Sequence, residues 1–267
     1  MNNLHRELAP VSAGAWAQIE QEAARTFKRH LAGRRVVDVS GPAGEALSAV
    51  GTGHLRDIEA PGDGVIARQR QVAALVELRA SFTLDREQID DVARGAQDSD
   101  WQPVKDAARK LAFAEDLAIF EGYPAAGITG IRPGSSNQVI TLPGDPRAYP
   151  EAVAQALSQL RVAGVGGPYS VVLSADAFTA VSETSDHGYP LIEHIKRQVN
   201  GDIVWAPAID GAIVLTTRGG DFDLQLGQDV AIGYAAHSTG AVEFYLQETV
   251  TFLMFTAEAA VGLAAAG

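Results

Sequence analysis

Two neighbouring stretches decide the fold of this chain: Arg218-Gly-Gly-Asp-Phe-Asp-Leu-Gln-Leu-Gly-Gln-Asp-Val-Ala-Ile-Gly-Tyr234, and Val242-Glu-Phe-Tyr-Leu-Gln-Glu-Thr-Val-Thr-Phe-Leu-Met254. Between positions 221 and 226 every second residue is apolar, which is typical of a strand with one buried face. The two strand-like runs flank a glycine-bounded turn. Neither run carries side chains arranged for catalysis, so this region of the sequence indicates a structural role rather than an active site.

The composition fits a globular protein with a substantial core: 267 residues, 46% hydrophobic and 20% charged. The formal net charge is −12 and no basic run occurs, which disfavours nonspecific binding to nucleic acid. The absence of cysteine excludes disulfides, zinc ribbons and thiol catalysis, and it fits a reducing cytosol. No secretory signal or membrane-spanning run is present, so we expect a cytoplasmic protein with no membrane partner.

Working outward, the apolar spacing predicts a mixed α/β chain with one long helix and one long arm. Ser12 is a plausible helix N-cap, and Gly33 ends that first helix. The stretch from Gly41 to Gly64 is rich in glycine and proline, and such a long weakly patterned segment indicates an extended arm. Further helices are expected at 101–120, 150–163, 176–183 and 190–199, and strands at 34–39, 75–84, 169–173, 203–207 and 212–217.

Short catalytic or ligand motifs are better explained as structure. The Gly62-Asp-Gly-Val-Ile-Ala67 string fits a loose dinucleotide fingerprint, which needs a strand before it and a helix opening on its second half. Here Pro61 precedes the string and a basic, strand-like run follows it, so a turn in the arm is the better interpretation. His187 and His194 are separated by seven positions and by Pro190, a spacing that does not preset a metal site. The acidic residues between positions 90 and 100 fit helix starts. We therefore predict no catalytic or metal-binding residues.

The chain is similar over its whole length to family 1 encapsulin shell proteins (linocin or bacteriocin-like, mycobacterial type). The resemblance is carried by short strings in the family's order and spacing: 8–10, Trp16, 33–38, 75–85, 120–122, 127–131, 167–169, 187–190, 219–222, 227–234 and 247–252. Such proteins build icosahedral compartments around enzyme cargo. This implies a tailed-phage major capsid (Hong Kong 97-type) fold with a spine helix, an extended E-loop and an inserted A-domain.

The resemblance also implies the order of the parts along the chain. Residues 1–46 would hold the N-terminal helix and the start of the P-domain, and 47–74 the E-loop arm. Residues 75–135 would form the P-domain with the spine helix, 136–222 the A-domain, and 223–267 the return to the P-domain. The implied assembly is a closed homo-oligomeric icosahedral shell, expected to be T=1.

The resemblance implies a groove that docks a short apolar C-terminal targeting peptide of the cargo. The matching positions give an apolar floor, a wall and polar edges: Phe27, Val36, Ile232, Tyr234, Arg34 and Asp38. The alternative is that Phe27 and Ile232 are plain core residues, since most apolar positions are simply buried. Replacing Ile232 by aspartate separates the two, because a core residue should cost assembly and a groove residue only cargo.

A second implied site is the five-fold pore, formed by Asp186, His187, Gly188 and Tyr189. The alternative is an ordinary turn between helices, because glycine and proline are common in such turns. Some relatives stack a flavin on a tryptophan in the helix after the Thr-Leu-Asp string. Here Arg86 stands at that position, so we expect no flavin and no other cofactor.

The implied cargo is a dye-decolourising peroxidase, in a role in oxidative-stress defence. A ferritin-like iron-storage cargo is the alternative. A phage capsid protein of the same fold is a further candidate, although the charge of −12 argues against an interior that holds DNA. A peptidase is disfavoured because no nucleophile–base pair is recognisable.

Overall fold

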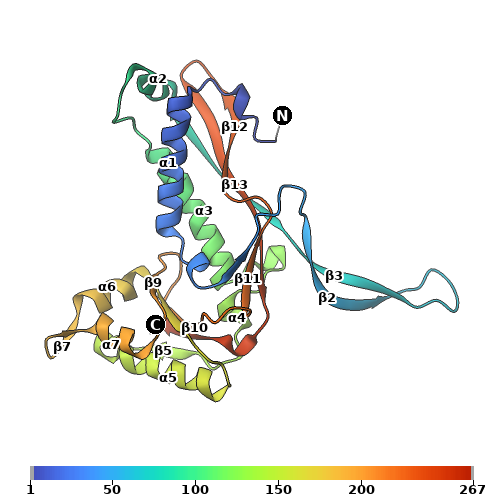
Figure 1. The fold of residues 1–267 in the computed structure, drawn as a ribbon, viewed down its shortest axis with the longest axis vertical. Helices are drawn as coiled ribbons and strands as arrows, with labels where there is room; N and C mark the ends of the chain where they lie inside the picture. Colours follow the sequence, from blue (N-terminus) through green and yellow to red (C-terminus); the bar gives the residue numbers. More distant parts are fainter. Residues whose placement is uncertain (1–2, 266–267) are drawn as a thin grey trace.

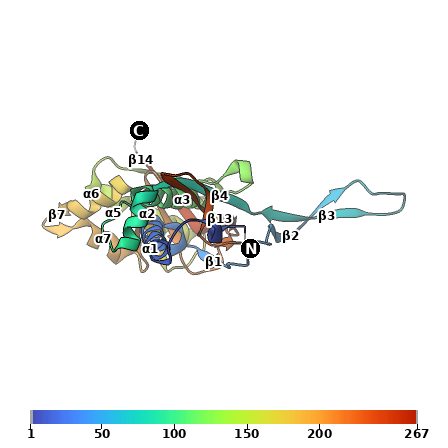
Figure 2. The same cartoon turned by 90° about the horizontal axis from the view of Figure 1, so that it is seen from above.

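The computed structural model describes residues 3–265 and shows a long, flat molecule with two lobes and one projecting arm (Figures 1 and 2). In the first lobe, the long helix α3 (Gln102–Phe120) lies between α1 (Ala13–His30) and a five-stranded sheet. The short helix α2 (Arg86–Arg94) covers the outer end. The sheet is formed by β1 (Asp38–Ser40), β4 (Val76–Asp85), β11 (Phe222–Leu226), β12 (Ala231–His237) and β13 (Ala241–Met254).

Strand β13 organises this sheet. Along one edge it pairs antiparallel with β4, from Ala241↔Asp85 to Val250↔Val76. Along its other edge β12 and β11 follow each other end to end, both antiparallel to β13. The break between β11 and β12 spans residues 227–230, where an added Cβ on Gly227 would lie 2.5 Å from the Thr249 hydroxyl. The turn predicted between the two quoted runs is formed by residues 238–240, which join β12 to β13.

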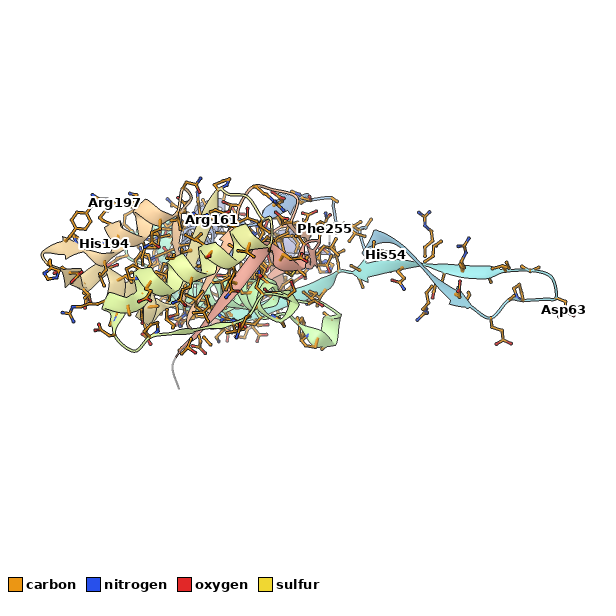
Figure 3. The ribbon with its side chains drawn as sticks, turned by 90° about the horizontal axis from the view of Figure 1, so that it is seen from below. His54, Asp63, Arg161, His194, Arg197 and Phe255 are labelled. Atoms are coloured by element: carbon orange, nitrogen blue, oxygen red, sulfur yellow. The ribbon has the colours of Figure 1, made fainter. Side chains whose placement is uncertain are left out.

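The arm is a two-stranded hairpin of β2 (Ala49–Ile58) and β3 (Ala67–Ala74). It leaves the body entirely, and His54 and Asp63 lie along it away from the rest of the molecule (Figure 3). After Leu75 the chain continues directly into β4. The arm is therefore covalently continuous with a strand of the first sheet.

The second lobe holds a separate sheet in the order β5-β14-β10-β6-β9, covered by helices. Its strands are β5 (Ile140–Leu142), β6 (Tyr169–Leu173), β9 (Ile203–Trp205), β10 (Ala212–Thr216) and β14 (Ala260–Ala265). Its helices are α5 (Tyr149–Val162), α6 (Ala175–Glu183) and α7 (Leu191–Gln198), and the short α4 (Ile131–Gly134) precedes it. A small hairpin of β7 (Ser185–Asp186) and β8 (Tyr189–Pro190) stands at the far tip.

Most predicted elements are confirmed, with ends within two residues for the helices. Ser12 caps α1 by accepting the Ala15 N–H, and Ser174 caps α6 through Ala177. The predicted strands at 75–84, 169–173, 203–207 and 212–217 correspond to β4, β6, β9 and β10. Asp100 accepts the Gln102 N–H at 2.8 Å just before α3 begins, as expected for an acid at a helix start.

Two predictions are wrong. The strand expected at 34–39 is a 3-10 turn at Gly33–Arg35, and strand pairing begins only at Asp38. The reason is that the N–H groups of residues 35–37 donate to the carbonyls of Ala32 and Gly33 within the turn and so are not free for a strand partner. The Asp116 carboxylate holds the start of this turn by accepting the Ala32 and Gly33 N–H groups. The range 223–267 was expected to return wholly to the first lobe, but β14 joins the second sheet between β5 and β10. Its only large apolar residues are Val261 and Leu263, and so short an alternation does not indicate which sheet the strand joins.

Candidate functional site

A groove of about 410 Å³ lies between α1 and the start of β12. One wall comes from α1, through Ala23, Ala24 and Phe27, and the other from Val230 to Ile232. Its rim is charged, with Arg6 and Glu20 paired at one side and Arg34 and Asp229 at the other. The groove therefore combines an apolar interior with polar edges, which is the usual composition of a site for a small apolar ligand or peptide.

Three of the six predicted docking residues, Phe27, Arg34 and Ile232, line this groove. Phe27 and Ile232 are only 7% and 4% exposed, and both belong to the core formed by α1, α3 and the sheet. Each therefore contributes one face to the groove while most of its surface packs inside. Phe27 and Ile232 are therefore core residues that also form the floor of the groove, and their role in docking a peptide stays a prediction.

Arg34 fixes the polar end of the groove. Its guanidinium carbon lies 5.3 Å from the ring centroid of Phe27, within cation–π range. Its Nε and Nη2 donate to Glu115 on α3, its Nη1 donates to Asp229 at 2.8 Å, and its Nη2 also donates to Glu248 on β13 at 3.1 Å. The side chains of Glu115 and Glu248 are fully buried. One arginine therefore joins α3, β13 and the β11–β12 break.

The charge at this end is set by burial. Burial raises the pKa of Glu248 well above its usual range, and the charge of Glu115 and a hydrogen bond with it raise that pKa further. Burial alone would lower the pKa of Arg34, but hydrogen bonds and charge from Glu115 and Asp229 raise it on balance. Burial also raises the pKa of Asp116 to about 7, against the opposing effect of the Ala32 and Gly33 N–H groups. Burial therefore favours the protonated form of Glu248, while Arg34 stays charged.

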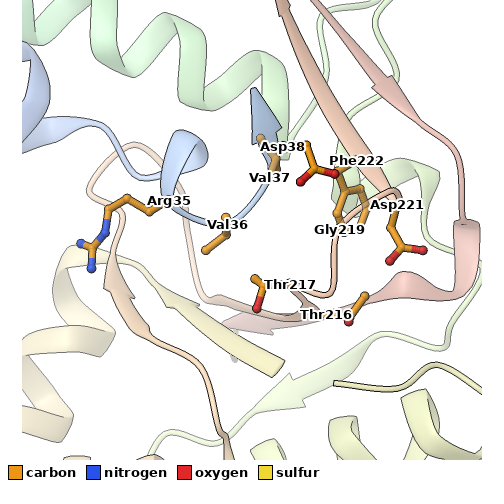
Figure 4. Close-up of a pocket in the computed structure, with 9 residues that line it drawn as sticks. All are labelled: Arg35, Val36, Val37, Asp38, Thr216, Thr217, Gly219, Asp221 and Phe222. Carbon is orange, nitrogen blue, oxygen red and sulfur yellow. The ribbon is translucent and has the colours of Figure 1, made fainter. Parts of the chain in front are cut away.

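The other three predicted docking residues lie elsewhere or beside the groove. Tyr234 follows Ile232 on β12 and packs against the same core, with its hydroxyl bonded to His237 Nδ1 at 2.5 Å. Val36 and Asp38 line a separate cavity of about 100 Å³ between β1 and the Thr216–Phe222 segment (Figure 4). The Asp38 carboxylate accepts the Gly220 N–H there. The structure thus brings Phe27, Arg34 and Ile232 together and separates Val36 and Asp38 from them.

The four predicted pore residues form the β7–β8 hairpin at the tip of the second lobe. Its turn residues His187 and Gly188 have φ values of 46° and 82°, as the two central positions of a type I′ turn require. The His187 side chain is 97% exposed and lies 3.8 Å from the Asp186 carboxylate. Tyr189 is anchored, because its ring stacks edge-on against His194 at 4.8 Å and the Arg197 guanidinium lies 4.6 Å from the ring centroid. The hairpin, anchored through Tyr189, therefore presents one carboxylate and one imidazole at its tip.

The position that the resemblance associates with flavin is Arg86, the first residue of α2. Its guanidinium lies 3.8 Å from Asp90, and its N–H donates to the Gly240 carbonyl. The nearby Trp101 is 8% exposed and donates to Gln18 on α1, so its ring is part of the core. Among residues 3–265 no group of three or more candidate ligands is arranged to hold a metal ion. Within the same range, none of the helices combines the length and apolar character that a bilayer crossing needs.

Comparison with known structures defines the fold. A virus-like particle from Pyrococcus furiosus superposes with a TM-score of 0.68 at 16% identity, covering 93% of this chain and 98% of that one. The capsid of Myoviridae phage XM1 gives 0.54 at 10% identity, covering 87% and 90%. The two lobes, the long helix and the projecting arm are thus those of the tailed-phage major capsid class, the Hong Kong 97-type fold predicted above.

Sequence comparison defines the family. Residues 1–251 match the family described as "Encapsulating protein for peroxidase". The type 1 encapsulin shell protein of Mycobacterium tuberculosis is 68% identical over 98% of this chain and 99% of its own length. That of Rhodococcus erythropolis is 63% identical, over 99% and 100%, and that of Brevibacterium linens 57%, over 98% and 99%. The chain therefore belongs to the type 1 encapsulin shell protein family, and the predicted family resemblance is confirmed.

Sequence reasoning missed the acids that hold Arg34, which are the buried Glu115 and Glu248 and the exposed Asp229. A signal for Glu115 does exist, because it stands four residues after Leu111 on the apolar stripe of α3, where a solvated acid is not expected. Asp229 and Glu248 gave no such signal, because a polar residue on a strand or at a break is ordinarily solvated.

Proposed function

We propose that this chain is a shell subunit that assembles into a closed icosahedral cage. The observation that carries the proposal is the arm formed by β2 and β3. An isolated two-stranded hairpin is at best marginally stable in water, and this one packs on nothing in its own subunit beyond its base. It also exposes large apolar side chains along its length: Leu55, Ile58, Val65, Ile66 and Val72, with exposed fractions of 45 to 88%.

A neighbouring subunit supplies the missing partner. Exposed apolar side chains on a free hairpin favour burial against another copy of the chain. Closed symmetry repeats the same interface many times, so a shell can be stable although each contact is modest. The family and the capsid fold support this assembly. We infer a T=1 shell as the simplest closed arrangement of identical subunits.

Shortening the arm tests the assembly. Leu55 pairs with Arg70, and Arg56 with Gln69, so removing residues 56–69 and joining the ends through Asn-Gly leaves a stub in register. We expect a folded subunit that no longer forms cages in size-exclusion chromatography and electron microscopy. The control is Gly62→Ala at the arm tip, where an added Cβ meets no atom within 4 Å. Intact cages from the shortened chain would show that the arm is not the clamp.

We further propose that the cage encloses a dye-decolourising peroxidase and that the groove between α1 and β12 docks its C-terminal targeting peptide. The family description supports the peroxidase, and the apolar interior with charged rims supports an apolar peptide. Burial of apolar surface contributes about 25 cal/mol per Å2, so a few side chains give moderate affinity, and the many sites of one shell add avidity. The cage with its cargo would reside in the cytoplasm.

Filling the groove tests docking without placing a charge in the core. Ala24 is exposed on α1 and lines the groove, so Ala24→Trp should block the peptide while cages still form. Ala235→Trp is the matched control, because Ala235 is exposed on β12 but does not line the groove. The measurement is the amount of co-expressed peroxidase that purifies with the cages. Equal cargo in both variants would place docking elsewhere, and selective retention of a ferritin-like protein in place of the peroxidase would change the cargo class.

We also propose that the β7–β8 hairpin lines the five-fold pore and that the shell carries no flavin. The exposed turn and the carboxylate–imidazole pair at the tip support the first point, and the Arg86–Asp90 pair at the start of α2 supports the second. An absorbance spectrum of purified cages tests the flavin directly, because a band near 450 nm that survives gel filtration would contradict the proposal.

A further inference from the structure

A second groove, of about 380 Å³, runs between α1 and α3 on a different side of α1 from the docking groove. Its walls combine charged and polar side chains from both helices: Glu22, Arg25, Thr26, Arg29, His30, Gln102, Lys105, Asp106 and Arg109. Four of these are arginine or lysine and two are carboxylates. This excess of positive charge is unusual in a chain whose net charge is −12.

The two carboxylates are already engaged within their own helices. Glu22 accepts Nη2 of Arg25 at 2.7 Å and also the Thr26 hydroxyl. On the facing helix, Asp106 accepts Nη2 of Arg109 and the Gln102 amide, both at 3.1 Å. These pairs are local and span three or four residues, so they neutralise the acids without crossing the groove.

Two cations are left without a carboxylate. Within residues 3–265, neither Arg29 nor Lys105 has an acidic group within 4 Å. In addition, the ion pairs of Arg25 and Arg109 use only Nη2, so their Nε and Nη1 groups remain available as donors. The groove therefore offers many N–H donors from two facing helices and almost no free acceptor.

We propose that this groove binds a small phosphate-bearing anion. Guanidinium groups match phosphate oxygens in forked geometry, and a lysine adds a point charge, so the two helices can hold a multivalent oxyanion between them. One negative charge would neutralise only one of the two uncompensated cations, which favours a multivalent ligand. The lining of charged and polar side chains fits a phosphorylated metabolite or pyrophosphate rather than an apolar protein segment.

The matched variants lie on the same two helices. The Arg29→Ala/Lys105→Ala double variant removes the two uncompensated cations. The control, Lys28→Ala/Lys110→Ala, removes the same charge from exposed positions on α1 and α3 that do not line the groove. All four side chains lie at the surface or partly exposed, so both variants should fold, and circular dichroism and gel filtration of the full-length protein verify this.

The experiment is isothermal titration of each full-length protein with inorganic pyrophosphate, free of divalent cations, at low and at high salt. We expect the unmodified protein and the control to bind with a Kd of about 1 mM or tighter. The double variant should bind at least about tenfold more weakly, and salt should weaken binding in the unmodified protein. No saturable binding, or an equal loss in the control, would overturn the proposal. Loss of assembly in the double variant without pyrophosphate binding by the unmodified protein would assign the groove to a contact between copies instead.

Discussion

Glu115 and Glu248 share a single nitrogen: Nη2 of Arg34 lies 2.5 Å from Oε2 of Glu115 and 3.1 Å from Oε2 of Glu248. One carboxylate comes from α3 and the other from β13, and both side chains are fully buried. When both of these buried carboxylates are ionised, they repel each other and only one cation lies between them. Burial and this repulsion therefore favour the state in which one of the two is protonated. Burial and the charge of Glu115 both raise the pKa of Glu248, which favours Glu248 as the protonated member.

Stability should therefore fall with rising pH because of Glu248. Its pKa is raised in the folded chain, mainly by burial, from an ordinary value of 4.5. Above that value the folded chain holds a proton that the unfolded chain has released, so the free energy of unfolding decreases until the pH passes the folded pKa. Glu248→Gln is neutral at every pH and removes this part of the slope. Thermal unfolding from about pH 5 to pH 9 should show a flatter profile for the variant. Parallel profiles for the two proteins would show that Glu248 does not hold the proton.

Removing the shared cation should be far more damaging than removing an exposed one. Arg34→Ala leaves buried carboxylates without their partner, which costs about 3–5 kcal/mol of unfolding free energy. Arg25→Ala is the control, because the Arg25 side chain is 69% exposed and its ion pair with Glu22 contributes about 1 kcal/mol or less. Denaturant unfolding of both variants checks the difference. Comparable losses would mean that Arg34 does not stabilise the join between α3 and β13.

Gly130 should tolerate no side chain. A Cβ added there would lie 2.1 Å from the Gly122 nitrogen and 2.6 Å from the Glu121 carbonyl carbon, and neither backbone atom can turn away. Gly130→Ala should therefore lower the free energy of unfolding by about 2 kcal/mol or more, because the end of α3 must shift. Gly144→Ala, where an added Cβ meets nothing within 4 Å, should have little effect. A stable Gly130→Ala protein would show that this close approach relaxes easily.

The β7–β8 hairpin should loosen when its anchor is removed. Tyr189→Ala deletes the stacking on His194 and the cation–π contact of Arg197, each worth about 1 kcal/mol. Opening of the hairpin should become roughly fivefold more frequent or greater, which hydrogen exchange of residues 185–190 measures. His187→Asn is the control, because asparagine tolerates the positive φ of this position. Uptake of a small reagent into cages should increase only in Tyr189→Ala, and unchanged uptake would place the route for solutes elsewhere.

Strong periodicity accounts for what the sequence could predict about the fold. The long helix at 101–120 and the strand at 75–84 repeat their apolar residues over many positions, and both are present. Helix α2 was not predicted from the pattern, because only Ile89 in it is fully buried and one position defines no period. Strand β14 was missed for a similar reason, since Val261 and Leu263 are its only large apolar residues and two positions do not assign a sheet.

For the proposed docking groove, too, the sequence could predict only some of the residues that line it. Phe27 and Ile232 could be placed together from the family's order of motifs, although they stand far apart in the sequence. Val36 and Asp38 follow Arg34 closely along the chain, yet the turn at Gly33–Arg35 sends them to a different cavity. A change of chain direction over three residues depends on the Asp116 carboxylate more than 80 positions later, which no local pattern records.

The continuity of β3 with β4 has a mechanical consequence. A pull on the arm passes through Leu75 into β4 and from there, through the ladder, into β13. The opposite edge of β13 carries β12, the strand that forms one wall of the docking groove. In the proposed shell, a load between neighbouring subunits would therefore pass through β13, which also supports the proposed docking groove. A chain in which β13 fails to form would lose both proposed contacts together.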